Sequence, residues 1–333
     1  MIYSFPLGSL SCVVISDGQP KPPWEPPLAE FFTPESGVPS EELCAVTHGR
    51  SSLALGYNCL CVRTPDGLVL LDTGLGKRFF GYGPQIEPLV GVLTDGLATA
   101  GYGAADVAAV VFTHLHQDHS RGATWRGESV FPTASAYAHA AEVAYWSSAA
   151  ATGPHLESAR QAIRLFGERL HRFRHDEEIL PNVRTVESAG HTPGHTAILL
   201  ESRGERLLCT GDSFYDPLQL THPDWCTPWD LDATRSARSR RRLLAWAADE
   251  NLLVHAYHLP FPGLGTVKRA GAAFTWSPLA PEAPEAPEAP EAPEATASTR
   301  SNRKLAAAGR RRASRCPGGD GCRNGDMSDK RQV

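Results

Sequence analysis

The sequence lacks a long apolar run, a paired cysteine pattern and a large net charge. No stretch approaches the roughly 20 apolar residues that a membrane helix requires, so we expect no membrane span. The first residues lack the basic start and apolar run of a signal peptide. The eight cysteines have no paired spacing, which favours reduced thiols in a cytoplasmic protein. A net charge of −5 over 333 residues disfavours a nucleic-acid partner.

Charge is concentrated near the C-terminus. Residues 281–295 repeat Pro-Glu-Ala five times, a composition typical of a stiff, charged, disordered spacer. Residues 296–333 hold ten Lys and Arg against three Asp, but no interleaved aromatic residues that would stack on nucleic-acid bases. The sequence therefore predicts a folded domain over 1–279, a disordered linker over 280–295 and a basic disordered tail over 296–333.

Three histidines and one aspartate stand within six positions of each other, directly after an apolar run. Residues 107–112 are typical of a buried strand. His114 and His116 follow two positions apart, so their side chains point to one face of an extended chain. Asp118 and His119 lie on the next turn and can fold back toward the same point. Imidazoles and carboxylates are preferred ligands of divalent metals such as zinc, so this spacing predicts a metal site.

Further histidines and aspartates follow other expected strands. His191 lies among two glycines and a proline that force a tight turn. Asp212 and His258 each follow an apolar strand, and so does Asp72. Asp72 either caps its turn or accepts a hydrogen bond from a metal-bound histidine. Without Asp72, the set contains seven metal-ligand candidates, a number that suits two ions.

Local patterns also predict the remaining elements. The proline-rich stretch 20–27 is expected to be a surface loop or a lid over a pocket. The arginines of the last helix are expected to form a solvated face. Strands are expected at 10–16, 52–63, 68–72, 107–112, 130–138, 183–186, 197–201, 206–209 and 252–257, and helices at 87–101, 140–150, 155–173 and 233–249.

These motifs resemble those of the metallo-β-lactamase superfamily over about residues 8–270. The HxHxDH motif of that family matches residues 114–119, and its later ligands match His191, Asp212 and His258. The resemblance implies an α/β fold, a four-layer αββα sandwich of two mixed sheets flanked by helices. It also implies that His114, His116 and His191 hold one ion, that Asp118, His119 and His258 hold another, and that Asp212 bridges the two.

Several positions narrow the choice within that family. Asp212 stands where well-known zinc β-lactamases carry Cys, which disfavours antibiotic hydrolysis. His116 stands where flavo-diiron proteins carry Glu. The segment 258–265 is similar to the branch containing methyl parathion hydrolase. Tyr215 matches a tyrosine of N-acyl-homoserine lactonases, with an ordinary buried aromatic as the alternative reading.

The resemblance implies a hydrolase that uses two zinc ions and a bridging hydroxide to cleave an ester, lactone or organophosphate bond. Mn, Co or Fe are alternative metals. The expected catalytic residues are Asp118, Asp212 and Tyr215, with Tyr215 donating to the oxyanion and Asp212 passing a proton to the leaving group. A glyoxalase II-like thioesterase and a mononuclear iron sulfur dioxygenase stay open. The expected partner is a small-molecule substrate, and a homodimer is compatible with the sequence.

Two histidines lie outside the expected ligand set, and several aromatic residues have two possible roles. His195 is expected to hydrogen-bond within its turn and His255 to pack. Six aromatic residues are expected either to line an apolar pocket or to belong to the core: Trp24, Phe31, Phe32, Phe214, Trp225 and Phe261.

Overall fold

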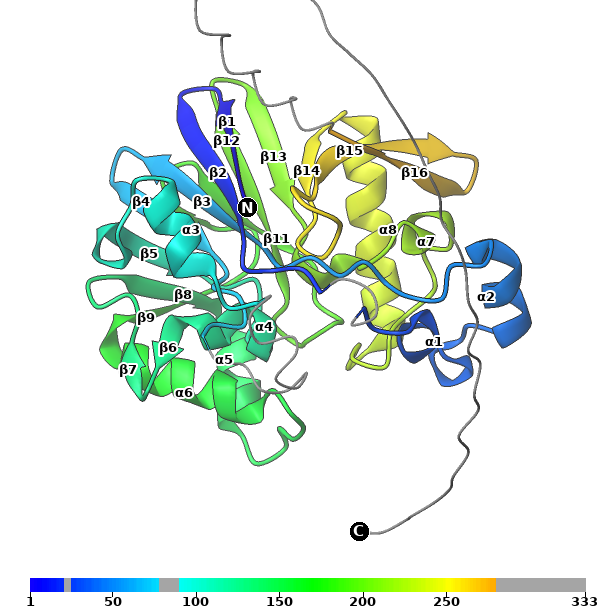
Figure 1. Cartoon of the computed structure of the whole chain (residues 1–333), viewed down its shortest axis with the longest axis horizontal. Coiled ribbons are helices and arrows are strands. Elements are labelled where there is room, and N and C mark those ends of the chain that lie inside the picture. The colour runs from blue at the N-terminus through cyan, green and yellow to red at the C-terminus, as the bar shows by residue number, and fades with distance from the viewer. Residues whose placement is uncertain (21–24, 78–89, 280–333) are drawn as a thin grey trace, which may run out of the picture. The chain divides into compact units, whose positions relative to one another are not determined.

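Two seven-stranded sheets pack face to face in the computed structural model, which describes residues 1–20, 25–77 and 90–279 (Figure 1). The first sheet has the order β1 (Ile2–Leu7), β2 (Leu10–Ser16), β3 (Asn58–Thr64), β4 (Gly67–Leu71), β5 (Val107–Val111), β8 (Ser135–His139) and β9 (Leu170–Phe173). The second has the order β10 (Glu178–Leu180), β11 (Val183–Glu187), β12 (Thr196–Ser202), β13 (Glu205–Cys209), β14 (Leu253–His255), β15 (Leu264–Ala270) and β16 (Ala273–Pro278). A separate hairpin joins β6 (Thr124–Trp125) to β7 (Glu128–Ser129).

Both sheets are mixed. Strands β4, β5, β8 and β9 are parallel neighbours, and so are β13 and β14, while the other pairs are antiparallel. Parallel neighbours need a long crossover connection. Helix α8 (Ala233–Asp249) lies in the crossover from β13 to β14. Parallel strands also bring their carboxyl ends to the same edge of a sheet, where the loops that follow can meet.

Because side chains alternate along a strand, each sheet packs on the inner core with one face and on helices with the other. In β2, Cys12 and Val14 point to the inner core between the sheets, while Val13 and Ile15 point to the helices outside. The first sheet's outer face is covered by α3 (Leu93–Thr99), α5 (Ala140–Ser147) and α6 (Leu156–Phe166), and the second's by α8. The predicted four-layer αββα sandwich is therefore confirmed.

Several predicted elements differ from the structure. The helix predicted over 155–173 ends with α6 at Phe166, because Gly167 adopts φ 51°, and the residues after it form β9. The strand predicted over 52–63 begins only at Asn58, and that over 130–138 only at Ser135. The sequence patterns missed β1, β15 and β16, and also α1 (Leu28–Phe31) and α2 (Ser40–Thr47), which follow the proline-rich stretch.

The predicted linker and tail, 280–295 and 296–333, lie outside the described residues, and so does Trp24. The domain boundary at 279 stays a prediction. In the part of the chain that is described, no helix is both long and apolar enough to cross a membrane.

The arginine face predicted for 233–249 is wrong at one position. Arg240 is fully buried. Its guanidinium donates to the carbonyls of Ser213 (2.5 Å), Pro223 (2.8 Å) and Trp225 (2.7 Å). Arg240 also lies 3.7 Å from the carboxylate of Asp230. The side chain therefore ties α8 to the segment that follows β13. A guanidinium has five N–H donors, so one arginine can bond several carbonyls at once.

Replacing Arg240 with Met should destabilise the fold strongly. The change removes the Arg240 hydrogen bonds to three carbonyls and the cation beside the buried carboxylate of Asp230, a loss of about 3 kcal/mol or more. Arg238→Met on the same helix removes an exposed arginine, so its effect should stay within about 0.5 kcal/mol. Urea unfolding of both variants measures the difference. Equal stability of the two would contradict the role given to Arg240.

Candidate metal centre

The predicted ligands of the first motif lie where β5 ends. His114 and His116 lie on an extended segment, and His116 precedes α4 (Gln117–Ser120). Asp118 and His119 lie inside that short helix, so the chain folds back as the spacing predicts. All three histidines are buried, and 18% of the Asp118 side chain is exposed. The carboxylate of Asp118 is therefore the member of this motif that solvent reaches most easily.

The other predicted ligands come from the second sheet. His191 lies in the turn between β11 and β12, and Asp212 lies in a 3-10 helix, η6 (Gly211–Ser213), after β13. His258 follows β14, the parallel neighbour of β13. Gly190 holds φ 140°, and a Cβ there would collide with the backbone of Ser236 in α8. Only glycine fits that close approach, which fixes the turn carrying His191.

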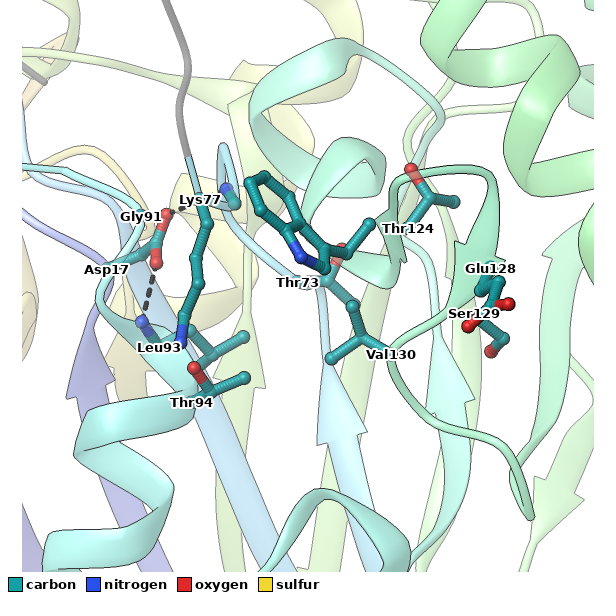
Figure 2. A pocket seen from close by; sticks show the side chains of 13 residues that line it. Asp17, Thr73, Lys77, Gly91, Leu93, Thr94, Thr124, Glu128, Ser129 and Val130 are labelled. Atoms are coloured by element: carbon teal, nitrogen blue, oxygen red, sulfur yellow. Dashed lines mark hydrogen bonds between the residues drawn. The ribbon is translucent and has the colours of Figure 1, made fainter.

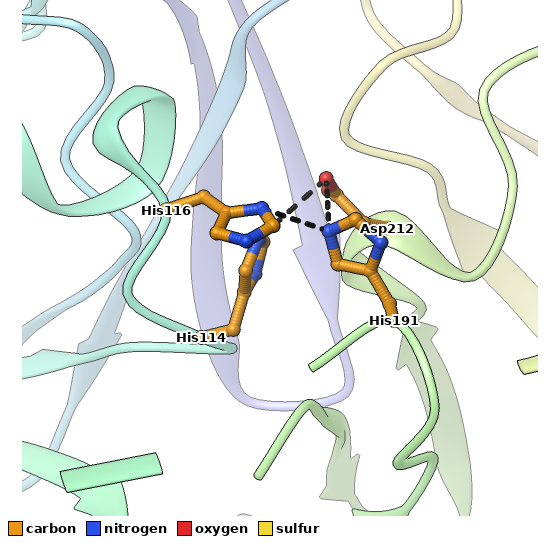
Figure 3. A group of neighbouring side chains, drawn as sticks. All are labelled: His114, His116, His191 and Asp212. Carbon is orange, nitrogen blue, oxygen red and sulfur yellow. Dashed lines mark hydrogen bonds and ion pairs between the residues drawn. The ribbon is translucent and has the colours of Figure 1, made fainter. Parts of the chain in front are cut away.

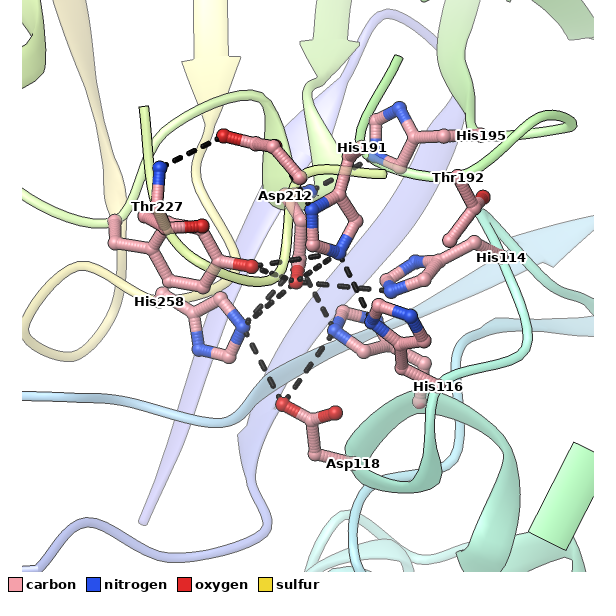
Figure 4. Close-up of polar contacts among 12 residues, drawn as sticks. His114, His116, Asp118, His191, Thr192, His195, Asp212, Thr227 and His258 are labelled. Atoms are coloured by element: carbon pink, nitrogen blue, oxygen red, sulfur yellow. Dashed lines mark hydrogen bonds and ion pairs between the residues drawn. The ribbon is translucent and has the colours of Figure 1, made fainter. Parts of the chain in front are cut away.

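The seven predicted ligands fall into two groups that share one residue. In each group the candidate ligand atoms all lie within 4.8 Å of one another (Figures 3 and 4). The shared residue is Asp212, whose carboxylate lies between the histidines of both sheets (Figure 4). The first group is His114, His116, His191 and Asp212, and the second is Asp118, His119, Asp212 and His258.

Unpartnered buried atoms at the centre fit a metal. His114 Nε2, His119 Nε2 and Asp212 Oδ1 are buried and make no hydrogen bond. Burying polar atoms without partners is costly, and such atoms need an explanation. His119 Nε2 and Asp212 Oδ1 are only 2.9 Å apart, so they point at the same space. Imidazole nitrogens and carboxylate oxygens converging in this way are a donor set that suits a divalent transition metal.

Asp72 orients one of these imidazoles. His119 Nδ1 donates to Asp72 Oδ2 at 2.8 Å, which leaves His119 Nε2 facing the centre. The same carboxylate accepts from the backbone N–H and the hydroxyl of Thr113, at 2.9 and 2.8 Å. Of the two readings of Asp72 from the sequence, the contacts favour the hydrogen bond to a histidine of the site.

Asp230 orients the imidazole of His191 in the same way. No sequence pattern indicated this residue. Its carboxylate accepts from His191 Nδ1 at 3.1 Å and from the hydroxyl of Ser236 at 2.8 Å. The backbone N–H of Thr227 donates to its other oxygen, which lies 3.7 Å from Arg240. His258 Nδ1 instead donates to a backbone carbonyl, that of Gly56, at 2.9 Å. The ring nitrogens that face away from the site are therefore held by the protein.

Charge and burial set the protonation states at the centre. Burial lowers the pKa of His114 and His116 well below the ordinary value, so both imidazoles are neutral. Burial also disfavours the charged form of His119, but the carboxylates of Asp212 and Asp72 outweigh it and raise the pKa of His119. Burial would raise the pKa of Asp212, yet the surrounding histidines hold it well below its usual range. Asp212 is therefore an ionised carboxylate.

The two spare histidines have separate roles. His195 Nε2 accepts from the backbone N–H of Asp212 at 3.0 Å, and His195 Nδ1 lies 2.9 Å from the hydroxyl of Ser188. His195 therefore braces the segment that carries Asp212, as well as its own turn. His255 is buried in β14, and its Nε2 makes no hydrogen bond, in keeping with the packing role expected for it.

A cavity of about 190 Å³ opens onto both groups. Tyr215 lines it, with its hydroxyl donating to Asp212 Oδ2 at 2.7 Å and its ring stacked on His258 at 4.7 Å. His155, which no motif indicated, also lines it and stacks on His116 with ring centroids 3.9 Å apart. The apolar part of the wall comes from Phe31, Leu55, Pro154 and Trp229.

The aromatic residues expected around the pocket divide. Phe31 lines the cavity, where it packs on Trp229 and Tyr215. Four others are packed in the core or against it, although none lines the cavity. Phe32 and Trp225 pack on each other, Phe214 packs beside α8, and Phe261 packs on the core between the sheets.

A second cavity, of about 280 Å³, is lined by none of the seven candidate ligands (Figure 2). Its wall includes Asp17, Lys77 and Trp125. The Asp17 carboxylate is already engaged by backbone N–H groups, among them those of Leu75 and Leu93. We therefore assign the chemistry to the smaller cavity, whose wall includes four of the seven candidate ligands.

Comparisons with known proteins agree with this geometry. A two-sheet sandwich with two groups of imidazoles and carboxylates at the strand ends is the architecture of a metal-binding protein. The family model of the metallo-beta-lactamase superfamily matches residues 53–258. The chain therefore belongs to the metallo-beta-lactamase superfamily.

Two curated relatives are 30% identical to this chain over 197 residues. They are "Probable metallo-hydrolase Mb2322c" of Mycobacterium bovis and "Probable metallo-hydrolase Rv2300c" of Mycobacterium tuberculosis. Each match covers 49% of this chain and 58% of the relative, so the chain spans little more than half the length of these relatives.

Solved structures share the fold at lower identity. AidC, described as a dizinc quorum-quenching lactonase, is 24% identical with a TM-score of 0.74, covering 84% of this chain and 97% of its own. The hydrolase AbOPH of the beta lactamase superfamily is 23% identical with a TM-score of 0.73, over the same shares. An N-acyl homoserine lactone hydrolase is 18% identical with a TM-score of 0.54, over 76% of this chain and 94% of its own.

Removing either orienting carboxylate should weaken the binding of a divalent metal. Asp72→Ala frees His119, and Asp230→Ala frees His191, so each variant should lose about 10–100-fold in metal affinity. Competition with a chromophoric chelator measures this. The control is Asp106→Ala, which removes an exposed carboxylate that accepts from the backbone N–H of Gly103. Affinities in Asp72→Ala and Asp230→Ala equal to the control would refute the orienting role.

Proposed function

We propose that the chain is a metal-dependent hydrolase that holds two zinc ions and cleaves an ester, lactone or organophosphate bond of a small molecule. The observation that carries the proposal is the position of Asp212, whose carboxylate belongs to both ligand groups. A carboxylate has two oxygens and can therefore hold two cations close together. In this proposal His114, His116 and His191 hold one ion, Asp118, His119 and His258 the other, and Asp212 both.

Bound divalent ions would supply Lewis acidity, lowering the pKa of water toward neutrality and polarising the substrate oxygen. Tyr215 is placed to donate to the oxyanion that develops during attack. Burial and the charge of Asp212 raise the pKa of Tyr215 well above its usual value, so the hydroxyl keeps its proton. Held at 2.7 Å from Asp212 and facing the cavity, it can turn to a substrate oxygen without a large movement.

Asp212 and Asp118 are the proposed proton carriers and complete the catalytic set. Asp212 belongs to both ligand groups, where it can pass a proton from the attacking water to the leaving oxygen. Asp118 lies at the cavity with its Oδ2 3.5 Å from His258 Nε2 and is the more exposed of the two. It can therefore exchange protons with solvent between turnovers.

The cavity wall supports a substrate with an apolar part. Phe31, Leu55 and Trp229 face the same space as the ligand groups. Similarity to structures named as lactonases and as a hydrolase supports the lactone and ester classes. A cytoplasmic location and, as an alternative to a monomer, a homodimer belong to the same proposal.

Metal analysis with a substrate panel tests this function. Purified protein should contain two zinc ions per chain, and chelation should abolish turnover. Lactones and aryl esters should be cleaved in preference to thioesters. A preference for thioesters would instead indicate a glyoxalase II-like enzyme. One iron per chain with oxygen consumption would instead indicate a sulfur dioxygenase and overturn the proposal.

Tyr215→Phe should lower kcat about 10–100-fold while leaving metal content unchanged. The variant keeps the ring that stacks on His258 and loses only the donor at 2.7 Å from Asp212. Steady-state kinetics on the best lactone, with zinc measured on the same samples, provides the check. An unchanged kcat would show that Tyr215 is an ordinary buried aromatic.

A further inference from the structure

Glu142 is a fully buried carboxylate in the first turn of α5. Four donors surround it. Its Oε1 accepts from the backbone N–H of Leu115 at 3.0 Å and from the indole N–H of Trp146 at 2.7 Å. Its Oε2 accepts from the hydroxyl of Thr192 at 2.6 Å and from the backbone N–H of Gly194 at 3.0 Å.

Three of the four donors belong to the two segments that carry the first ligand group. Leu115 stands between His114 and His116. Thr192 directly follows His191, and Gly194 lies two residues further on. A Cβ at Gly194 would collide with the backbone of Glu142, so the turn rests directly on α5. One carboxylate thus joins a segment of the first sheet to a turn of the second.

We propose that Glu142 is a positioning residue that sets the distance from His114 and His116 to His191. In this way it determines how tightly the first ligand group binds its metal ion. The inference rests on the metal-binding part of the proposed function. Glu142 itself touches no reacting atom.

Burial makes this link stiff. No ion pair of Glu142 occurs among the residues that the structure describes, so hydrogen bonds alone compensate the loss of water around the carboxylate. A charged acceptor forms stronger hydrogen bonds than a neutral one, and each lost donor leaves part of the charge unsatisfied. The two segments are therefore held more firmly than a solvent-exposed contact could hold them.

The second group does not depend on this link. His119 is fixed by Asp72 through its ring, and its backbone carbonyl accepts from the N–H and hydroxyl of Thr73 at 2.7 and 2.8 Å. His258 is fixed by the carbonyl of Gly56. Loss of Glu142 should therefore affect one metal ion more than the other, which separates positioning from a general loss of stability.

Two variants that each remove one hydrogen bond to Glu142 test the inference. Thr192→Val cuts the link to the turn that carries His191, and valine has nearly the same shape as threonine. Trp146→Phe removes a donor from the same helix as Glu142, so no link between segments is lost. The phenyl ring can keep the edge contact that Trp146 makes with His116. Glu142→Ala removes all four bonds.

The measurements are zinc stoichiometry and stepwise affinity of the full chain by chelator competition, with the Tm of the metal-free protein beside them. We expect Thr192→Val to weaken one of the two zinc sites about 10-fold and Glu142→Ala about 100-fold, with the other site unchanged. Trp146→Phe should lower Tm but bind both ions as the unmodified protein does. If Glu142→Ala does not fold, the contrast between Thr192→Val and Trp146→Phe decides.

Equal zinc affinities in Thr192→Val and Trp146→Phe would overturn the positioning role, whatever their Tm values. Equal weakening of both sites in Thr192→Val would overturn it too, because a general loosening predicts that result. Failure of the proposed function is recognised separately: the unmodified protein would then bind no pair of metal ions at all.

Discussion

The carboxylate of Asp212 is the constraint on which the rest of the site depends. It is buried and ionised, and histidines from both sheets surround it. An isolated charge of this kind would be very costly, so the protein must bring opposite charge or a cation to it. Histidines of both sheets meet this requirement by surrounding the Asp212 carboxylate. Each sheet contributes part of the candidate ligand set, since His119 comes from the first sheet and His191 from the second.

Three other buried carboxylates form a ring outside the ligands. Asp72 holds His119, Asp230 holds His191, and Glu142 holds the backbone N–H groups of Leu115 and Gly194, in the two segments that carry His114, His116 and His191. Each accepts from more than one element, so each couples the position of an imidazole to the packing of a strand or helix. The precision of the site is therefore a property of the sandwich as a whole, and Arg240 extends the same network into α8.

The local parts of this arrangement could be predicted from the sequence, and the distant parts could not. The spacing of His114, His116 and Asp118 is readable because strand period and turn geometry fix it within a few residues. Asp72 was indicated by its place at a strand end. Glu142 and Asp230 gave no signal, because the ligand-bearing segments that they contact lie 27 to 52 residues away and ordinary helix or loop patterns surround them. In the same way, the buried Arg240 looks like its exposed neighbours until the fold supplies carbonyls to meet it.

The parallel pairing of β13 and β14 has an evolutionary consequence. Asp212 and His258 leave adjacent strand ends, yet the long crossover between them contains Tyr215, Trp229 and Asp230. The pairing of β13 with β14 fixes where Asp212 and His258 stand. The chain between them can vary where it only lines the cavity, as at Trp229, but not at Asp230, whose carboxylate holds His191. A new substrate range can therefore arise at Trp229, or at Phe31 and Leu55 outside the crossover, without displacing the candidate ligands.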